Sequence, residues 1–295
     1  MSLVTPEASA AVSTSRACPL LKVRNLCTHF PIRSGLLRRV TGQLKAVDDV
    51  SFDLDRGQTI GLVGESGCGK STLARTILRL IKPHSGNVYF DGQDLMDLSQ
   101  RQLRHKRRSM QIVFQDPVGS LNPRLRIETI VGEPLRVHRV ASGQELKRRV
   151  HALLEECGLP TDAARRFPHE FSGGQRQRIG IARALALDPQ LIVCDEPTSA
   201  LDVSIQAQIL NLLQDLQAKH HLAYLFISHD MSVISHVCDQ IAVMHKGKIV
   251  EMGSRDQVVN NPQNVYTQRL LSAVPSVDNW QSPVSGGLGG SSTVG

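Results

Sequence analysis

The 295-residue sequence predicts an α/β fold, because short apolar runs typical of buried strands alternate with longer segments of helical periodicity. Two strand–helix pairs carry this prediction. TIGLVG (59–64) is followed by STLARTILRL (71–80), and LIVC (191–194) is followed by apolar residues at the i, i+4, i+7, i+8 and i+11 positions of the 205–216 segment. A chain of this length can bury a substantial core around such elements.

The other elements follow from the same two periodicities. A basic loop, Arg33–Thr41, is expected after the first strand, and the 241–253 segment is expected to form a hairpin that turns at Lys246-Gly247. The 101–157 segment is mostly helical in character, apart from the short apolar run QIVFQ (111–115). Further strands are expected at LLKVRNLCTHF (20–30), AVDDVSFDL (46–54), NVYFDG (87–92) and LAYLFIS (222–228).

The composition narrows the possible classes of protein. Hydrophobic residues make up 41% and charged residues 21%, which excludes a wholly disordered chain. The net charge of +7 would suit an anionic ligand, a membrane surface or nucleic acid, but aromatic residues at 4% argue against a stacking platform for single strands. No run approaches the ~18 apolar residues of a membrane span, and the first residues lack the basic and apolar regions of a secretory signal.

The six cysteines show no pair at metal-binding spacing, and we expect them to be reduced thiols of a cytosolic protein. Cys68 differs from the others, because Lys70 and a helix N-terminus follow it directly. Both features favour a thiolate. Cys68 is therefore expected to be reactive.

A glycine-rich segment after the 59–64 strand fits G-x-x-x-x-G-K-[ST], the pattern of a loop that binds nucleotide phosphates. Its backbone N–H groups would surround the phosphates, Lys70 would neutralise the β and γ oxygens, and Ser71 would ligate Mg²⁺. An ordinary glycine-rich turn is the alternative, but the strand before the segment and the helix after it favour phosphate binding. The candidate residues are Gly64, Glu65, Ser66, Gly67, Cys68, Gly69, Lys70, Ser71 and Thr72.

Two adjacent acids, Asp195 and Glu196, follow the apolar LIVC strand. Asp195 would hold Mg²⁺ through water, and Glu196 would orient or deprotonate the attacking water. Alone, an apolar strand followed by acids often marks only the start of a loop. The phosphate-loop pattern upstream favours the catalytic interpretation.

A second candidate anion site lies in FSGGQRQR (171–178), where a Ser-Gly-Gly sequence precedes an apolar helix at Ile179–Leu187. A capped helix with no ligand is the alternative. With the two motifs above, this segment resembles the signature motif of the ATP-binding cassette (ABC) ATPases. In that family the motif caps the γ-phosphate of the ATP held by the other subunit, which implies this role for Ser172, Gly173, Gly174 and Gln175.

The resemblance implies roles for four further residues. Gln115 corresponds to a glutamine that touches Mg²⁺ and moves with the transmembrane partner, and Asp202 lies in a loop that communicates across the dimer. His229 corresponds to the switch histidine that contacts the γ-phosphate, and Phe30 to the aromatic residue that stacks on adenine. Taken singly, they would be a surface glutamine, a helix N-cap, a structural histidine and a core phenylalanine.

The resemblance covers roughly residues 20–253 and implies a phosphate-loop NTPase (RecA-like) core with an N-terminal antiparallel β subdomain and an inserted α-helical subdomain. We expect a disordered N-terminus over 1–19 and an ATPase domain over 20–260, with the helical subdomain at about 117–184. A C-terminal segment and a flexible tail would occupy 261–295. The implied activity is hydrolysis of ATP, with Mg²⁺ as cofactor.

A narrower resemblance lies in the segments 29–33, 121–124 and 261–275, which are similar to those of oligopeptide and dipeptide importer ATPases. Nickel and glutathione importers share these features, so the solute stays open. Some members of the subfamily continue into a cysteine-containing extension that binds an iron–sulfur cluster. No cysteine follows Cys238 here, and no cluster is expected.

The implied partners are two transmembrane permease subunits, a second ABC ATPase subunit that is usually a paralogue, and indirectly an extracytoplasmic solute-binding protein. The implied location is the cytoplasmic face of the inner membrane, with no nucleic-acid partner. A DNA-repair ABC ATPase is disfavoured, because roughly 100 residues between Lys70 and Ser172 leave no room for a long coiled coil. A translation factor would carry two sets of motifs, and a non-catalytic regulatory subunit would not need an intact Glu196 and His229.

Overall fold

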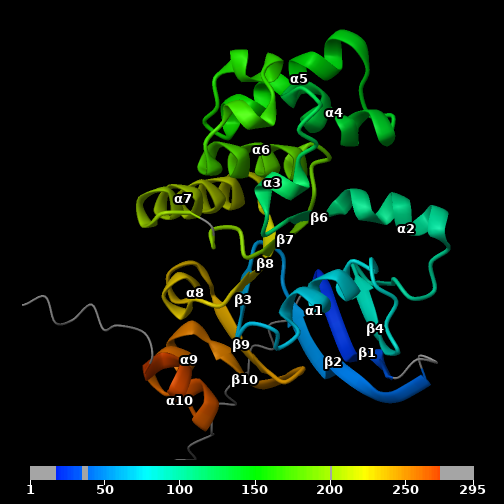
Figure 1. Cartoon of the computed structure of the whole chain (residues 1–295), viewed down its shortest axis with the longest axis vertical. Helices are drawn as coiled ribbons and strands as arrows, with labels where there is room; N and C mark the ends of the chain where they lie inside the picture. The colour runs from blue at the N-terminus through cyan, green and yellow to red at the C-terminus, as the bar shows by residue number, and fades with distance from the viewer. Residues whose placement is uncertain (1–17, 35–38, 200, 273–295) are drawn as a thin grey trace, which may run out of the picture.

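The computed structural model describes residues 18–34, 39–199 and 201–272. Two β-sheets occupy one half of the molecule, and a layer of helices occupies the other half (Figure 1). The N-terminal stretch expected to be disordered and the tail from Pro275 lie outside the described residues, apart from residues 18 and 19.

The central sheet has six strands in the order β10-β9-β3-β8-β7-β6. The five strands from β9 to β6 are parallel, and β10 pairs antiparallel with β9. Every residue of β3, β7 and β8 is buried, as expected for a parallel sheet covered on both faces. The strands are β3 (Thr59–Val63), β6 (Met110–Val113), β7 (Leu191–Asp195), β8 (Ala223–Ser228), β9 (Gln240–His245) and β10 (Lys248–Ser254).

The carboxyl ends of β3, β8 and β7 meet at one edge of this sheet. Val63 pairs with Ser228, and Asp195 pairs with Ile227. The loops that follow these three strands therefore lie side by side, which is where ligands bind in open α/β sheets. The glycine-rich segment, Glu196 and His229 all belong to these loops.

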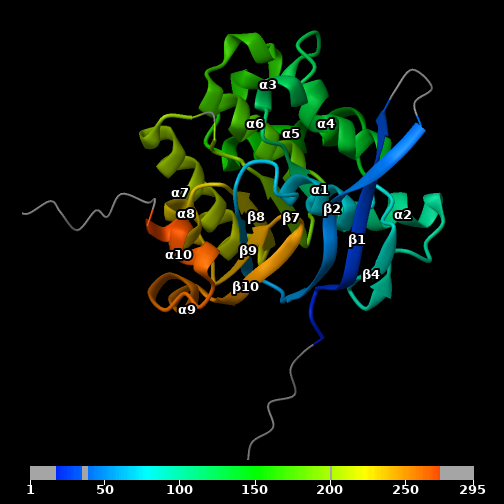
Figure 2. The same ribbon diagram turned by 60° about the horizontal axis from the view of Figure 1, so that its bottom comes forward.

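A second, antiparallel sheet has the order β2-β1-β4-β5. The prediction of a basic loop over Arg33–Thr41 is wrong for the residues that the structure describes there. Strand β1 extends to Ser34, β2 begins at Arg39, and these two ends pair with each other. This pairing uses backbone groups, which charged residues also carry, and the end of the hairpin projects outward from the molecule (Figure 2). The strands are β1 (Leu21–Ser34), β2 (Arg39–Leu54), β4 (Ser85–Phe90) and β5 (Gln93–Asp94).

The helical layer contains α3 (Pro117–Ser120), α4 (Ile127–Val137), α5 (Gly143–Glu156) and α6 (Gly173–Leu185) (Figure 1). The predicted apolar face of α5 is buried through Leu146, Val150 and Leu154. Helix α6 contacts α3, α4 and α5, and it also contacts β6 and α7 (Val203–His220). Helix α6 thus joins the helical layer to the central sheet.

The remaining helices surround the sheets. They are α1 (Lys70–Ile77), α2 (Gln100–Lys106), α8 (Met231–Val237), α9 (Arg255–Asn260) and α10 (Val265–Ser272), with short 3₁₀ turns at η1 (Arg107–Ser109), η2 (Thr161–Arg165) and η3 (Pro168–Glu170). The predicted hairpin turn at Lys246-Gly247 is confirmed between β9 and β10. None of the helices in the described residues combines the length and the apolar character needed to cross a bilayer.

Candidate functional site

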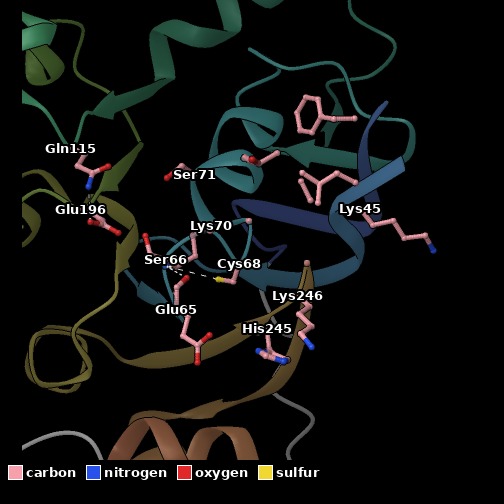
Figure 3. A pocket seen from close by; sticks show the side chains of 17 residues that line it. Lys45, Glu65, Ser66, Cys68, Lys70, Ser71, Gln115, Glu196, His245 and Lys246 are labelled. Atoms are coloured by element: carbon pink, nitrogen blue, oxygen red, sulfur yellow. Dashed lines mark hydrogen bonds between the residues drawn. The ribbon is translucent and has the colours of Figure 1, made fainter. Parts of the chain in front are cut away.

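A cavity of about 500 Å³ lies where β3 and β7 end, a volume within the range of ligand pockets. Gln115 and Glu196 lie on one side of it and Lys45 on the opposite side (Figure 3). The residues that line it are Phe30, Leu44, Lys45, Ala46, Glu65, Ser66, Gly67, Cys68, Gly69, Lys70, Ser71, Thr72, Gln115, Glu196, His245, Lys246 and Gly247.

The glycine-rich loop closes tightly between β3 and α1. Gly69, the N-cap of α1, has a φ of 114°, a conformation that residues with a side chain rarely adopt. A Cβ atom at this position would lie 2.0 Å from the carbonyl oxygen of Ala46 on β2. Only glycine allows this close approach, which brings the N-terminus of α1 to the floor of the cavity.

Lys70 is 4% exposed, and its ammonium crosses the loop. Its Nζ donates to the carbonyl oxygen of Gly64 at 2.6 Å and to that of Glu65 at 2.9 Å. The cavity therefore holds a buried cation whose partners are neutral carbonyl groups. This arrangement suits an anionic ligand.

Ser71 and Asp195 form a pair of oxygen donors at the start of α1. The Ser71 hydroxyl donates to Oδ1 of Asp195 at 2.8 Å, and Asp195 is 1% exposed. Burial raises the pKa of Asp195 above its ordinary value, although the hydrogen bond from Ser71 and the charges of Arg75 and Lys70 oppose that shift. A hydroxyl and a carboxylate are hard oxygen ligands, and this donor set fits Mg²⁺.

Glu196 contacts two side-chain nitrogen atoms from different loops. Its Oε2 accepts from Nε2 of Gln115 at 2.8 Å and lies 3.2 Å from Nδ1 of His229. The backbone of Glu196 has a φ of 48°, in the left-handed region, and its N–H donates to the carbonyl oxygen of Ile227 at 3.0 Å. The neighbouring strand therefore fixes a backbone conformation that is unfavourable for a glutamate and turns the side chain toward the cavity.

Phe30 lies in the wall of the cavity with 37% of its surface exposed, opposite Leu44 in the β1–β2 register. An exposed aromatic ring at a cavity wall can stack on a planar ligand. Its expected stacking on adenine remains a prediction.

Eight predicted site residues are not among the lining residues of this cavity. Gly64, Asp195 and His229 adjoin it through contacts with Lys70, Ser71 and Glu196. The other five lie apart from it, namely Ser172, Gly173, Gly174, Gln175 and Asp202. Ser172 is the N-cap of α6 and forms a capping box with Gln175. Asp202 is the N-cap of α7, where its Oδ1 accepts from the Ile205 backbone N–H at 2.9 Å. A Cβ at Gly174 would lie 2.4 Å from Cγ2 of Ile205, so these two helix starts pack together.

Sequence reasoning missed six residues that line the cavity, in the segments 44–46 and 245–247. The first segment lies in β2, and the second consists of the last residue of β9 and the two-residue turn that leads to β10. The turn was predictable, but its position beside the glycine-rich loop depends on the parallel pairing of β3 with β9. No signal in the sequence reports that pairing.

All six cysteines are free thiols in the structure. The prediction that the environment of Cys68 favours a reactive thiolate is wrong. Burial raises the pKa of the Cys68 thiol, and the ammonium of Lys70, 4.0 Å from the sulfur, offsets only part of this effect. Burial opposes a charged thiolate here more strongly than the neighbouring cation favours it.

Cys27, His29 and Asp48 form another group of side chains that could ligate a cation. However, the ammonium groups of Lys45 and Lys248 lie 3.6 and 3.4 Å from Oδ2 of Asp48. The lysines already compensate the charge of this carboxylate. This group is therefore a weaker candidate for a cation site than the predicted set of Ser71, Gln115 and Asp195.

Comparison with known proteins gives one family match. The family model described as "ABC transporter" matches residues 47–199, which include the glycine-rich loop, the 171–178 segment and Glu196.

Two relatives illustrate the similarity over most of the chain. The chain is 54% identical over 264 residues to the glutathione import ATP-binding protein GsiA of Pectobacterium atrosepticum, covering 90% of this chain but 42% of GsiA. It is 53% identical over 257 residues to the oligopeptide transport ATP-binding protein AppF of Bacillus subtilis, covering 87% of this chain and 78% of AppF. The chain thus spans less than half the length of GsiA.

Solved structures share the fold. CbiO1 from Clostridium perfringens, part of the ABC transporter complex cbiONQ, superposes with a TM-score of 0.70 at 27% identity, covering 82% of this chain and 91% of that one. The ATP-binding cassette MJ0796, a dimer in a post-hydrolysis state with ADP and Pi, gives a TM-score of 0.70 at 30% identity, covering 80% and 98%. The fold described above is therefore that of the ABC ATPases, as the sequence resemblance implied.

Alkylation tests the environment of Cys68. The thiolate is the reactive form, so iodoacetamide at neutral pH should label the exposed Cys18 at least about tenfold faster than Cys68. Mass spectrometry of peptides sampled over time measures both rates, and a Cys18→Ser variant identifies the early product. Faster labelling of Cys68 would contradict the raised pKa.

Proposed function

This chain belongs to the ABC transporter family, and we propose that it is the ATP-hydrolysing subunit of an importer of short peptides. The observation that carries the ATPase assignment is the carboxylate of Glu196, held by Gln115 and His229 beside the cavity that Lys70 lines. The 53% identity to AppF supports an importer of peptides.

ATP is the proposed substrate of the cavity. Lys70 would exchange its two carbonyl partners for the β and γ phosphate oxygens, and the N-terminus of α1 would add backbone N–H groups. Ser71 and Asp195 would hold Mg²⁺, with Gln115 as a further ligand, and the ion would neutralise charge on the phosphates. Phe30 would stack on the adenine.

Glu196 would act as the base that orients or deprotonates the attacking water. An ionised carboxylate can only accept hydrogen bonds, so the Nδ1 atom of His229 must carry the proton in this contact. With Gln115 donating to the same oxygen, two donors fix the direction of the carboxylate and leave its other oxygen for water. His229 would in turn contact the γ-phosphate, as in the family that the chain resembles.

The signature segment would serve the ATP of a second subunit. In this chain Ser172, Gly173, Gly174 and Gln175 do not line the cavity, although the start of α6 suits an anion. A pair of ATPase subunits, with Asp202 of each at the interface, would bring each signature segment to the other subunit's nucleotide. MJ0796, with the same fold, is dimeric. The second subunit would be a paralogue.

The rest of the proposed complex follows from the resemblance to peptide importers. Two permease subunits would dock on the helical subdomain, at about residues 117–184, at the cytoplasmic face of the inner membrane. An extracytoplasmic binding protein would deliver the solute. Glutathione is the second candidate solute, because GsiA is named for glutathione import, whereas nickel or a nucleic-acid partner has no support from the relatives reported above.

Glu196→Gln should lower ATP hydrolysis at least about a hundredfold, because the water loses its base while the shape of the site is kept. MgATP binding should persist, and a long-lived ATP-bound dimer should appear in size-exclusion chromatography. Glu155→Gln makes the same change on the exposed surface of α5 and serves as the control. Hydrolysis near the wild-type rate would remove Glu196 from the role of base.

Ser172→Arg should abolish hydrolysis while the isolated subunit binds MgATP within about twofold of the wild type, because the signature segment serves the partner's nucleotide. Ser99→Arg removes an equivalent capping box at the start of α2 and controls for loss of the cap alone. Loss of ATP binding by the monomeric Ser172 variant would contradict the two-subunit mechanism.

Deletion of the gene should abolish growth on dipeptides or oligopeptides as the source of amino acids, while uptake of free amino acids stays normal. Uptake of a radiolabelled tripeptide with ordinary α-peptide bonds, of glutathione, of nickel and of a sugar measures the choice of solute. Normal peptide uptake with lost glutathione, nickel or sugar uptake would contradict the peptide assignment but not the importer assignment. Lost efflux with normal uptake would contradict both.

A further inference from the structure

The C-terminal helix α10 is fixed to the edge of the central sheet by a set of hydrogen bonds. The carboxylate of Glu251 on β10 accepts from the backbone N–H groups of Gln263 at 2.7 Å and Asn264 at 3.0 Å. The Asn264 side chain accepts from the backbone N–H of Tyr266 at 2.8 Å. The first turn of α10 therefore has a defined position relative to the sheet.

From this turn, Tyr266 reaches the glycine-rich loop. Its hydroxyl oxygen accepts from the backbone N–H of Glu65 at 3.1 Å. Its ring packs on that of His245, with a centroid distance of 4.0 Å and an interplanar angle of 42°. Glu65 and His245 lie near each other in the cavity wall (Figure 3), so one tyrosine contacts two parts of this wall.

Tyr266 and Lys70 hold the same residue of the loop. The N–H of Glu65 donates to Tyr266, and the carbonyl oxygen of Glu65 accepts from the ammonium of Lys70 at 2.9 Å. A phosphate that draws the ammonium away would leave Glu65 without the Lys70 contact, and Tyr266 would still hold its N–H. A tyrosine hydroxyl is already neutral at physiological pH, and burial raises the pKa of Tyr266 further above its ordinary value.

We propose that Tyr266 is a positioning residue of the phosphate-binding loop, which makes α10 a functional part of the nucleotide site. Through Glu65, it keeps the start of the loop in place while Lys70 changes partners. A loop fixed in advance loses less conformational freedom when its ligand binds. The effect on nucleotide affinity rests on the proposed ATPase function, whereas the effect on the loop does not.

The first test is hydrogen exchange of the Glu65 amide without nucleotide. Tyr266→Phe removes the hydroxyl and retains the ring that packs on His245, so protection of this amide should fall at least about tenfold. Tyr89→Phe removes a hydroxyl from β4, in the other sheet, and should leave the amide unchanged. Unchanged protection in the Tyr266 variant would overturn the proposal.

The second test is MgATP affinity, measured by calorimetry on the full chain. Tyr266→Phe should weaken binding about fivefold, the effect of one neutral hydrogen bond, while the thermal midpoint stays near that of Tyr89→Phe. A lowered midpoint with unchanged affinity would indicate a merely structural role and overturn the proposal. A wild-type chain that binds no MgATP would overturn the proposed function, and the amide exchange would still decide whether Tyr266 fixes the loop.

Discussion

The parallel pairing of β3, β8 and β7 is the constraint on which the site depends. All three strands are buried along their whole length, so their register is fixed by packing on both faces. This register delivers Lys70, Asp195 and His229, which are far apart in the sequence, to one edge of the sheet. The strand register brings side chains there into contact, as the hydrogen bond between Ser71 and Asp195 shows.

Local patterns were sufficient for most of the fold and for the phosphate-loop side of the site. The apolar runs predicted β3, β7 and β8. The glycine spacing predicted the loop after β3, and the positive φ of Gly69 explains why a glycine is needed there. The predictions that were wrong concern features that depend on tertiary contacts. The β1–β2 hairpin is longer than predicted, because its ends pair through backbone groups although the sequence there is charged. The pKa of Cys68 is raised by burial, which the local sequence does not indicate.

The site residues fall into two groups on this chain. One group surrounds the cavity, and the other caps the starts of α6 and α7, which pack against each other through Gly174 and Ile205. Helix α6 also contacts α3, α4, α5 and β6, so it links this second group to the other helices of the layer and to the central sheet. The resemblance implied that the signature segment serves another subunit, and in the structure its residues do not line the cavity of this chain.

Because Lys70 already has two carbonyl partners, binding of a ligand at the glycine-rich loop depends on the charge of that ligand. Any ligand that recruits this ammonium must replace two charge-assisted hydrogen bonds, each contributing about 1.5–3 kcal/mol. A neutral ligand group cannot compensate for that loss, whereas the oxygens of a phosphate group can, because their negative charge attracts the ammonium more strongly than carbonyl dipoles do. The internal hydrogen bonds of the loop therefore disfavour neutral ligands, independently of any contact with the rest of the ligand.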